Sequence, residues 1–128
     1  MNQTVREDPV RIHRDGTAFF DGGNYEQAVE RFLQASKLYE NVGDFFDACY
    51  TLFRAAECSF LLKDYETAAE RFLKAADMAF DKGFDRFALG ALEYAKDCYE
   101  ASGETKDKKA SSIDKRIIEV KEKLSKTF

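Results

Sequence analysis

The chain has 128 residues, of which 45% are hydrophobic and 34% charged, so it can bury a core without the disulfides or metals that small stapled folds need. One proline, no tryptophan, twelve Phe and six Tyr favour an all-α fold with aromatic packing. The net charge of −4 is uneven, because residues 104–128 carry eight basic and five acidic side chains. A basic terminal helix is more often a solvated face than a nucleic-acid arm, so nucleic-acid binding is not expected.

The sequence shows no mark of export or membrane insertion. No apolar run approaches the roughly 20 residues that a membrane-spanning helix needs. The first residues, MNQTVREDPVRIHRDG, are polar and do not resemble a signal peptide. Three cysteines without a pairing pattern indicate reduced thiols. We therefore expect a cytoplasmic protein.

The first predicted hairpin covers about residues 8–41. Apolar residues recur at helical spacing from Ile12 until the pair Gly22-Gly23 interrupts them, which predicts a helix over 8–21. Asn24 can cap a second helix, over 25–41, because its side chain can accept a hydrogen bond from the first turn. The apolar face of this second helix consists of Tyr25, Ala28, Phe32 and Ala35.

The second predicted hairpin, about 45–81, repeats the first at a distance of 40 residues. The stretch DYETAAERFLKA, which begins at Asp64, matches NYEQAVERFLQA, which begins at Asn24, at eight of twelve positions. The repeat predicts helices over 45–62 and 65–81. Gly43 and Gly83 are expected to end the second helices of their units in a left-handed conformation.

The third predicted hairpin, about 84–126, departs from the repeat. Its helices are expected over 84–101 and 110–126, and the second fits only if five residues are inserted within SGETKDKKASS. Bulky aliphatic side chains then take the packing positions of the last helix: Ile113, Ile117, Val120 and Leu124. A terminal repeat is expected to be atypical because it caps the stack.

These units predict one domain over residues 1–128, made of three stacked antiparallel helix hairpins in a short α-solenoid. Connections this short force neighbouring helices to run antiparallel. Small residues would let the backbones approach, namely Ala28, Ala35, Ala55 and Ala56. One hairpin cannot cover its apolar face alone, whereas three hairpins make a continuous core.

The repeated residues resemble the tetratricopeptide repeat. The first unit matches through Ile12, Gly16, Phe19, Gly23, Tyr25, Ala28, Phe32 and Ala35, and the second through Leu52, Ala56, Phe60, Tyr65, Ala68, Phe72 and Ala75. The period of 40 rather than about 34 residues implies longer helices. Long-helix arrays with YE-x-AA openings are similar to the soluble NSF attachment proteins of the vesicle-fusion machinery. The last residues, LSKTF, lack the acidic tail with leucine found in that group.

The resemblance implies a non-catalytic adaptor that binds a peptide or helix of another protein. In such repeats the first helix of each unit typically lines a shallow concave groove. Carried over to this chain, the partner-binding residues are Phe20, Tyr50, Phe53, Glu57, Phe60, Glu93 and Asp97, with the aromatic rings as anchors and Glu57 and Glu93 as charge readers. The Lys and Asn clamp that holds a C-terminal carboxylate in some of these domains is missing, because His13, Thr17, Phe53 and Glu57 occupy its positions.

The helix over 45–62 is apolar on both sides, and two interpretations remain open. It is either sandwiched between its neighbours, or part of it is a groove floor that awaits a partner. A third possibility concerns the last helix, which could join a second copy of the chain and make the protein a self-associating subunit through its apolar face of Ile113, Ile117, Ile118, Val120 and Leu124.

No residue pattern indicates catalysis, a cofactor or a metal. There is no phosphate-binding glycine loop, nucleophile elbow or metal-ligand spacing. His13, the single histidine, is expected at the surface. Cys58 and Cys98 take a position where a small buried residue is expected, whereas Cys49 is expected to be partly exposed and is the thiol to examine for redox activity. An enzyme or small-molecule sensor would need an unrecognised pocket between hairpins.

Overall fold

The computed structural model describes residues 7–103 and 108–126, and this part of the chain contains six helices and no strand. They are α1 (Pro9–Asp21), α2 (Tyr25–Asn41), α3 (Phe45–Leu61), α4 (Tyr65–Asp81), α5 (Asp85–Ser102) and α6 (Lys108–Ser125). The all-α prediction is confirmed, and every helix boundary lies within two residues of its predicted place. The predicted insertion falls partly on residues 104–107, outside the described residues.

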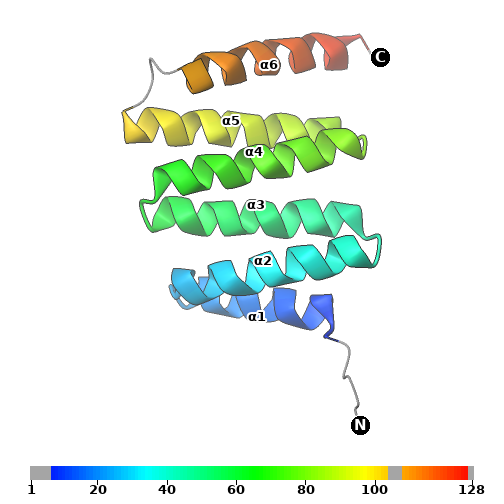
Figure 1. Ribbon diagram of the computed structural model, residues 1–128, viewed down its shortest axis with the longest axis vertical. Coiled ribbons are helices and arrows are strands. Elements are labelled where there is room, and N and C mark those ends of the chain that lie inside the picture. Colours follow the sequence, from blue (N-terminus) through cyan, green and yellow to red (C-terminus); the bar gives the residue numbers. More distant parts are fainter. Residues whose placement is uncertain (1–6, 104–107, 127–128) are drawn as a thin grey trace.

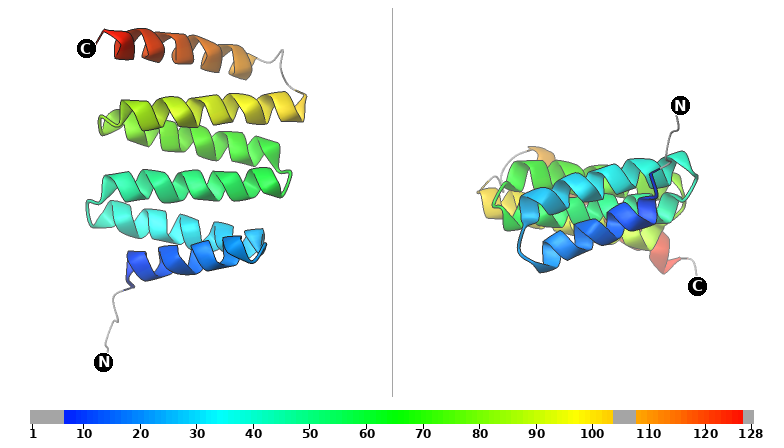
Figure 2. Two further views of the ribbon diagram at one scale, coloured as in Figure 1. Left: turned by 180° about the vertical axis from the view of Figure 1, so that it is seen from behind. Right: turned by 90° about the horizontal axis from the view of Figure 1, so that it is seen from below.

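The helices form a stack in two layers, with α1 at one end and α6 at the other (Figure 1). Each helix packs against the next in the chain. Ring contacts join α1 to α3 and α3 to α5, which places the odd-numbered helices in one layer. An ion pair and a cation–π contact of Arg116 join α6 to α4 in the other. Viewed from below, α1 and α2 lie side by side at the near end (Figure 2).

The turns recur every 20 residues, each with one residue in the left-handed conformation. Four of these residues are glycines, as expected where a positive φ is needed, and the fifth is Lys63 with φ 64°. Asp8 and Asp64 cap their helices through side-chain hydrogen bonds. Asn24 stands at the N-cap of α2, but its side chain makes no capping hydrogen bond, so that part of the cap prediction is wrong.

The core lies between the layers and is built from small residues around a few large rings. The alanines that were predicted to let the helices approach are fully buried: Ala28, Ala35, Ala55 and Ala56. Phe32 of α2 and Phe72 of α4 fill the space beside them, with exposed fractions of 0% and 1%. The largest buried cluster continues from α3 to α6. The grouping of the whole chain into one domain of three hairpins stays a prediction.

Candidate functional site

Large apolar side chains are exposed mainly on one layer of the stack. Among the described residues they include Val10 of α1, Phe46, Tyr50, Phe60 and Leu61 of α3, and Tyr94 of α5, whereas α2 and α4 expose none. We call this layer's outer surface the α1/α3/α5 face. The other layer exposes only Ile118 of α6 and Val42, which follows α2, among the large hydrophobic residues that the structure describes. An exposed apolar surface is costly in water, so its concentration on the α1/α3/α5 face marks that face as the candidate binding surface.

The four predicted aromatic anchors divide into two pairs. Tyr50 and Phe60 are each 37% exposed, so both can meet a partner. Phe20 and Phe53 are half-buried. The ring of Phe53 lies 5.0 to 5.5 Å from three other rings, those of Phe72, Phe87 and Tyr94, so much of it is used to pack α3 against α4 and α5. One side of α3 is therefore buried and the other is exposed, and the interpretation of the exposed side as a groove floor stays a prediction.

A pocket of about 180 Å³ opens between α3 and α5. Its floor is the buried ring of Phe72 from α4, and its walls are Glu57, Phe60 and Leu61 from α3 and Tyr94 and Asp97 from α5. The structure thus brings three predicted site residues together here: Glu57, Phe60 and Asp97. Tyr50 and Glu93 do not line the pocket.

The three predicted acidic residues differ in their partners. Glu57 pairs with Arg54 on its own helix at 3.0 Å. Glu93 lies 3.7 Å from the Nζ of Lys121, so it forms an ion pair with α6 at the end of the stack. Asp97 makes no ion pair with any residue that the structure describes, and it stands at the pocket with an exposed side chain. Asp97 is therefore the carboxylate most open to an incoming cation.

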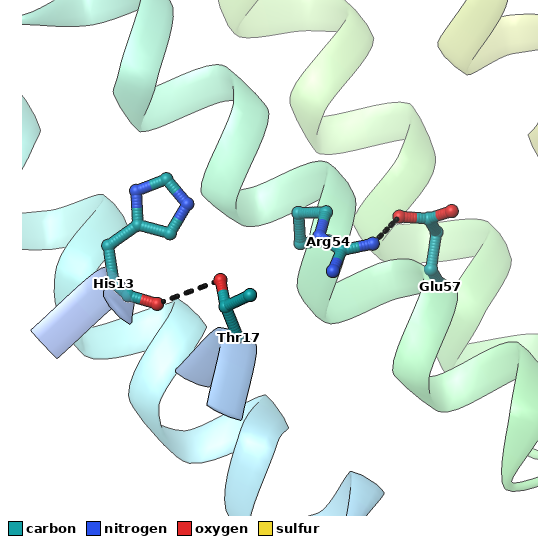
Figure 3. Close-up of polar contacts among 4 residues, drawn as sticks. All are labelled: His13, Thr17, Arg54 and Glu57. Carbon is teal, nitrogen blue, oxygen red and sulfur yellow. Dashed lines mark hydrogen bonds and ion pairs between the residues drawn. The ribbon is translucent and has the colours of Figure 1, made fainter. Parts of the chain in front are cut away.

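Arg54 is a site residue that the sequence analysis missed. Its guanidinium carbon lies 4.2 Å from the ring centroid of Phe20 and 5.3 Å from that of Phe32, so it packs in the space between α1 and α3. Figure 3 shows the guanidinium turned toward Glu57, with His13 and Thr17 of α1 nearby. The signal was available, since Arg54 lies three residues before Glu57 on the same helical face. Tyr94 was missed in the same way, three residues before Asp97.

His13 is half-buried, which corrects the prediction of a surface residue. Its ring lies 5.8 to 6.0 Å from the rings of Phe32, Tyr39 and Tyr50, so it packs among aromatic side chains of α2 and α3. Its Nδ1 is 3.1 Å from the hydroxyl of Tyr39. Burial, and next the charge of Arg54, hold the pKa of His13 below its usual value, which favours the neutral imidazole.

The three cysteines are buried and free of disulfides. Cys58 and Cys98 were expected to be buried, and they are. Cys49 was expected to be partly exposed, and this is wrong: its side chain faces the core cluster and has no exposed surface. Burial raises the pKa of the Cys49 thiol to about 11, so almost no reactive thiolate exists near neutral pH.

The apolar residues of α6 are mostly used within the chain. Ile113 and Ile117 are 3% and 7% exposed, because they pack into the core cluster with α5. Val120 also packs against that cluster, and Leu124 is half-buried. Ile118 is 59% exposed and is the one large hydrophobic residue of α6 that faces outward. Little of the predicted self-association surface is therefore open.

Within residues 7–103 and 108–126, no three side chains among His, Cys, Asp and Glu are grouped as a metal site requires. In the same residues no helix combines the length and apolar character needed to cross a membrane.

Comparisons with known proteins place this arrangement in a family. No curated protein and no solved structure shows a significant match to the chain. The family model described as "Soluble NSF attachment protein, SNAP" matches residues 10–127, which include all six helices except the first residue of α1. The match supports the narrower of the two resemblances, while the tetratricopeptide repeat itself stays a prediction. The chain belongs to the soluble NSF attachment protein family.

Proposed function

We propose that this chain is a non-catalytic cytoplasmic adaptor that binds a peptide or helical segment of another protein on its α1/α3/α5 face. The observation that carries the proposal is the concentration of exposed aromatic side chains, among them Tyr50, Phe60 and Tyr94, on that layer. The family supports it, because soluble NSF attachment proteins are helical adaptors of the vesicle-fusion machinery rather than enzymes.

The chemistry of the face suggests what kind of segment it accepts. Tyr50 and Phe60 offer apolar contact, and Glu57 and Asp97 add negative charge between them and α5. An amphipathic helix that lays its apolar side chains on such a surface and places basic residues beside the carboxylates would be complementary in both respects. Complementary charge would set the register of the bound helix on the face, and the aromatic rings that become buried upon binding would provide most of the affinity.

Tyr50 gives the cleanest test, because it is exposed and lies outside the pocket. We expect Tyr50→Ser to reduce recovery of the partner from lysate by about tenfold or more, as loss of an aromatic hot-spot residue does. Val42→Ser is the matched control, since Val42 is 68% exposed but follows α2 on the other layer. Mass spectrometry would compare the proteins recovered with wild type and both variants. Equal loss of partner with the two variants would contradict the assignment of the face.

A second candidate is a self-associating subunit, which the outward-facing Ile118 supports. A stable protein interface usually buries about 800 Å² on each partner, and one isoleucine offers only a small part of that. Light scattering at micromolar concentration tests the idea. A dimer that Ile118→Glu dissociates would support it, and a monomer at all concentrations would contradict it.

A further inference from the structure

The internal repeat builds the same space twice on the α1/α3/α5 face. The first space lies between α1 and α3, and the second, the pocket described above, lies between α3 and α5. Positions 40 residues apart supply the same parts to each: Phe32 and Phe72 as the floor, Phe20 and Phe60 as the aromatic wall, and Glu57 and Asp97 as the carboxylate. Even the ring beside the wall is repeated, because Tyr25 contacts Phe20 at 5.4 Å as Tyr65 contacts Phe60 at 5.2 Å.

The first space is filled by a cation from the chain itself. The guanidinium of Arg54 lies 4.2 Å from the Phe20 ring and 5.3 Å from the Phe32 ring, and it pairs with Glu57 at 3.0 Å. Cation–π attraction and the ion pair act on the same group, so this combination of rings and carboxylate is a guanidinium site.

The second space has the same parts but no cation. Tyr94 takes the position of Arg54, and its ring stacks on Phe72 at 5.3 Å with an interplanar angle of 19°. Tyr94 thus covers the floor but supplies no charge. The Phe60 ring remains 37% exposed, and Asp97 remains without an ion pair in the described part of the chain.

The size of the second space limits what can enter it. Its volume of about 180 Å³ is below the roughly 300–1,000 Å³ of sites that hold a drug-sized ligand. One long side chain fits this volume better than a whole metabolite. A planar guanidinium suits it better than a compact ammonium, because it can lie flat on aromatic rings while it pairs with a carboxylate.

We propose that the pocket between α3 and α5 binds an arginine side chain of the partner segment. The guanidinium lies against Phe60 and Tyr94 and pairs with Asp97, as Arg54 lies against Phe20 and pairs with Glu57 in the first space. The inference rests on the proposed function for the source of the arginine, whereas the affinity of the pocket for a guanidinium is a property of this chain alone.

The direct test uses N-acetyl-arginine methylamide as the probe in an NMR titration of the full chain. We expect saturable shifts in the millimolar range at the ring signals of Phe60 and Tyr94. The neutral isostere N-acetyl-citrulline methylamide should bind at least about fivefold more weakly, since it keeps the shape but loses the charge. Equal binding of the two probes, or shifts that spread over other acidic surfaces, would overturn the proposal.

Three variants separate the pocket from general charge effects. Asp97→Asn should abolish the preference for arginine over citrulline. Glu66→Gln is the matched control and should leave it intact, because Glu66 is exposed on α4 and does not line the pocket. Tyr94→Arg should abolish probe binding by filling the second space from within, and Tyr94 is 48% exposed, so the change is compatible with folding. Unchanged probe binding by Tyr94→Arg would overturn the proposal.

The outcomes also separate this inference from the proposed function. If Tyr50→Ser loses the partner but the wild-type chain does not bind the arginine probe, the adaptor function stands and the proposed arginine pocket is overturned. If the wild-type chain binds the probe but Tyr50→Ser shows no loss of partner, the arginine pocket stands and the assignment of the α1/α3/α5 face as the binding surface is overturned.

Discussion

The two spaces on the α1/α3/α5 face share a floor ring, an aromatic wall and a carboxylate, and they differ most in the side chain that lies over the floor. In the first, Arg54 reaches across the rings of Phe20 and Phe32 and closes the space. In the second, Tyr94 stands in its place and leaves a pocket of about 180 Å³. The comparison teaches that the repeat keeps the two floor rings, Phe32 and Phe72, while it changes the side chain that lies over each of them.

The two floor rings are constrained because they are also part of the core. Phe32 and Phe72 have no free surface to vary, and a change in either disturbs the packing between layers. Arg54 and Tyr94 are less buried, because the Arg54 side chain is 16% exposed and Tyr94 is 48% exposed. The comparison can be tested first by variants of the buried residues that form the two spaces and then by variants of the less buried side chains over the floors, in order of decreasing effect.

The largest effect is expected from the two floors. Phe32→Ala and Phe72→Ala should each lower the free energy of unfolding by about 3–5 kcal/mol, because each leaves a ring-sized cavity between helices. Urea denaturation followed by circular dichroism measures both. A cost for Phe72→Ala much smaller than for Phe32→Ala would show that the second space is not a packed copy of the first.

Gly16→Ala should have the next largest effect on the free energy of unfolding, and it should disturb the packing of the first space alone. A Cβ at Gly16 would lie 2.9 Å from two ring atoms of Phe32, and that ring is fully buried and cannot move aside. Overpacking of this kind costs about 1–3 kcal/mol. The second space already has Ala56 at the matching position, so the two spaces also differ here. Unchanged stability of Gly16→Ala in urea denaturation would mean that α1 can shift away from α2.

Most of the fold could be predicted from the sequence because the repeat is local and periodic. The apolar spacing of each helix and the glycines of the turns fixed the helix boundaries to within two residues. The insertion before α6 interrupted that periodicity, and there the predicted start of the helix, residue 110, differs most from the observed one, Lys108. Asn24 shows the remaining limit, since a capping residue type does not ensure a capping hydrogen bond.

The candidate site was harder to predict because it depends on contacts between units. Helical spacing placed Glu57, Phe60 and Asp97 on one face, but it could not show that Phe53 is used for packing by three other rings. The role of Arg54 depends on two rings from α1 and α2, which no spacing within α3 can indicate. His13 and Cys49 were misplaced for the same reason, because a neighbouring helix covers each of them.

Removal of the Arg54 guanidinium from the first space should lower the free energy of unfolding by less than removal of a buried floor ring. We expect Arg54→Met to lower the free energy of unfolding by about 1–2 kcal/mol, the sum of a partly desolvated cation–π contact and a weak ion pair. Tyr94→Met is the matched change in the second space and should cost about 1 kcal/mol or less, because only one ring contact of a half-exposed side chain is weakened. Equal losses of unfolding free energy for the two variants in urea denaturation would contradict the idea that the charge of Arg54, and not only its shape, stabilises the first space.

The turns offer a smaller test. Lys63 adopts φ 64° after α3, where the matching position after α1 is Gly23 with φ 77°. A residue with a Cβ is strained in this region, so Lys63→Gly should raise the free energy of unfolding by up to about 1 kcal/mol, partly offset by the greater freedom of glycine in the unfolded chain. Gly23→Lys should have the opposite sign in the same urea assay. A loss of stability in Lys63→Gly would show that the Lys63 side chain makes a compensating contact.

The smallest expected effect is a pH dependence confined to the first space, where His13 stands at the position that Phe53 takes in the second. The pKa of His13 is lowered by burial and then by Arg54, so the unfolded chain takes up the proton first as the pH falls. Its contribution to stability is therefore complete above about pH 6.5 and is lost as the pH falls from there toward the folded-state pKa.

The measurement compares urea midpoints of wild type and His13→Phe between about pH 7.5 and pH 5, because the difference removes the other titrating groups. We expect the wild-type midpoint to fall more steeply below about pH 6.5 than that of His13→Phe. Arg54→Met should reduce the difference, since it removes the second cause of the lowered pKa. Parallel profiles for wild type and His13→Phe would show that the imidazole can be protonated without loss, and hence that the cation in the first space does not control its charge.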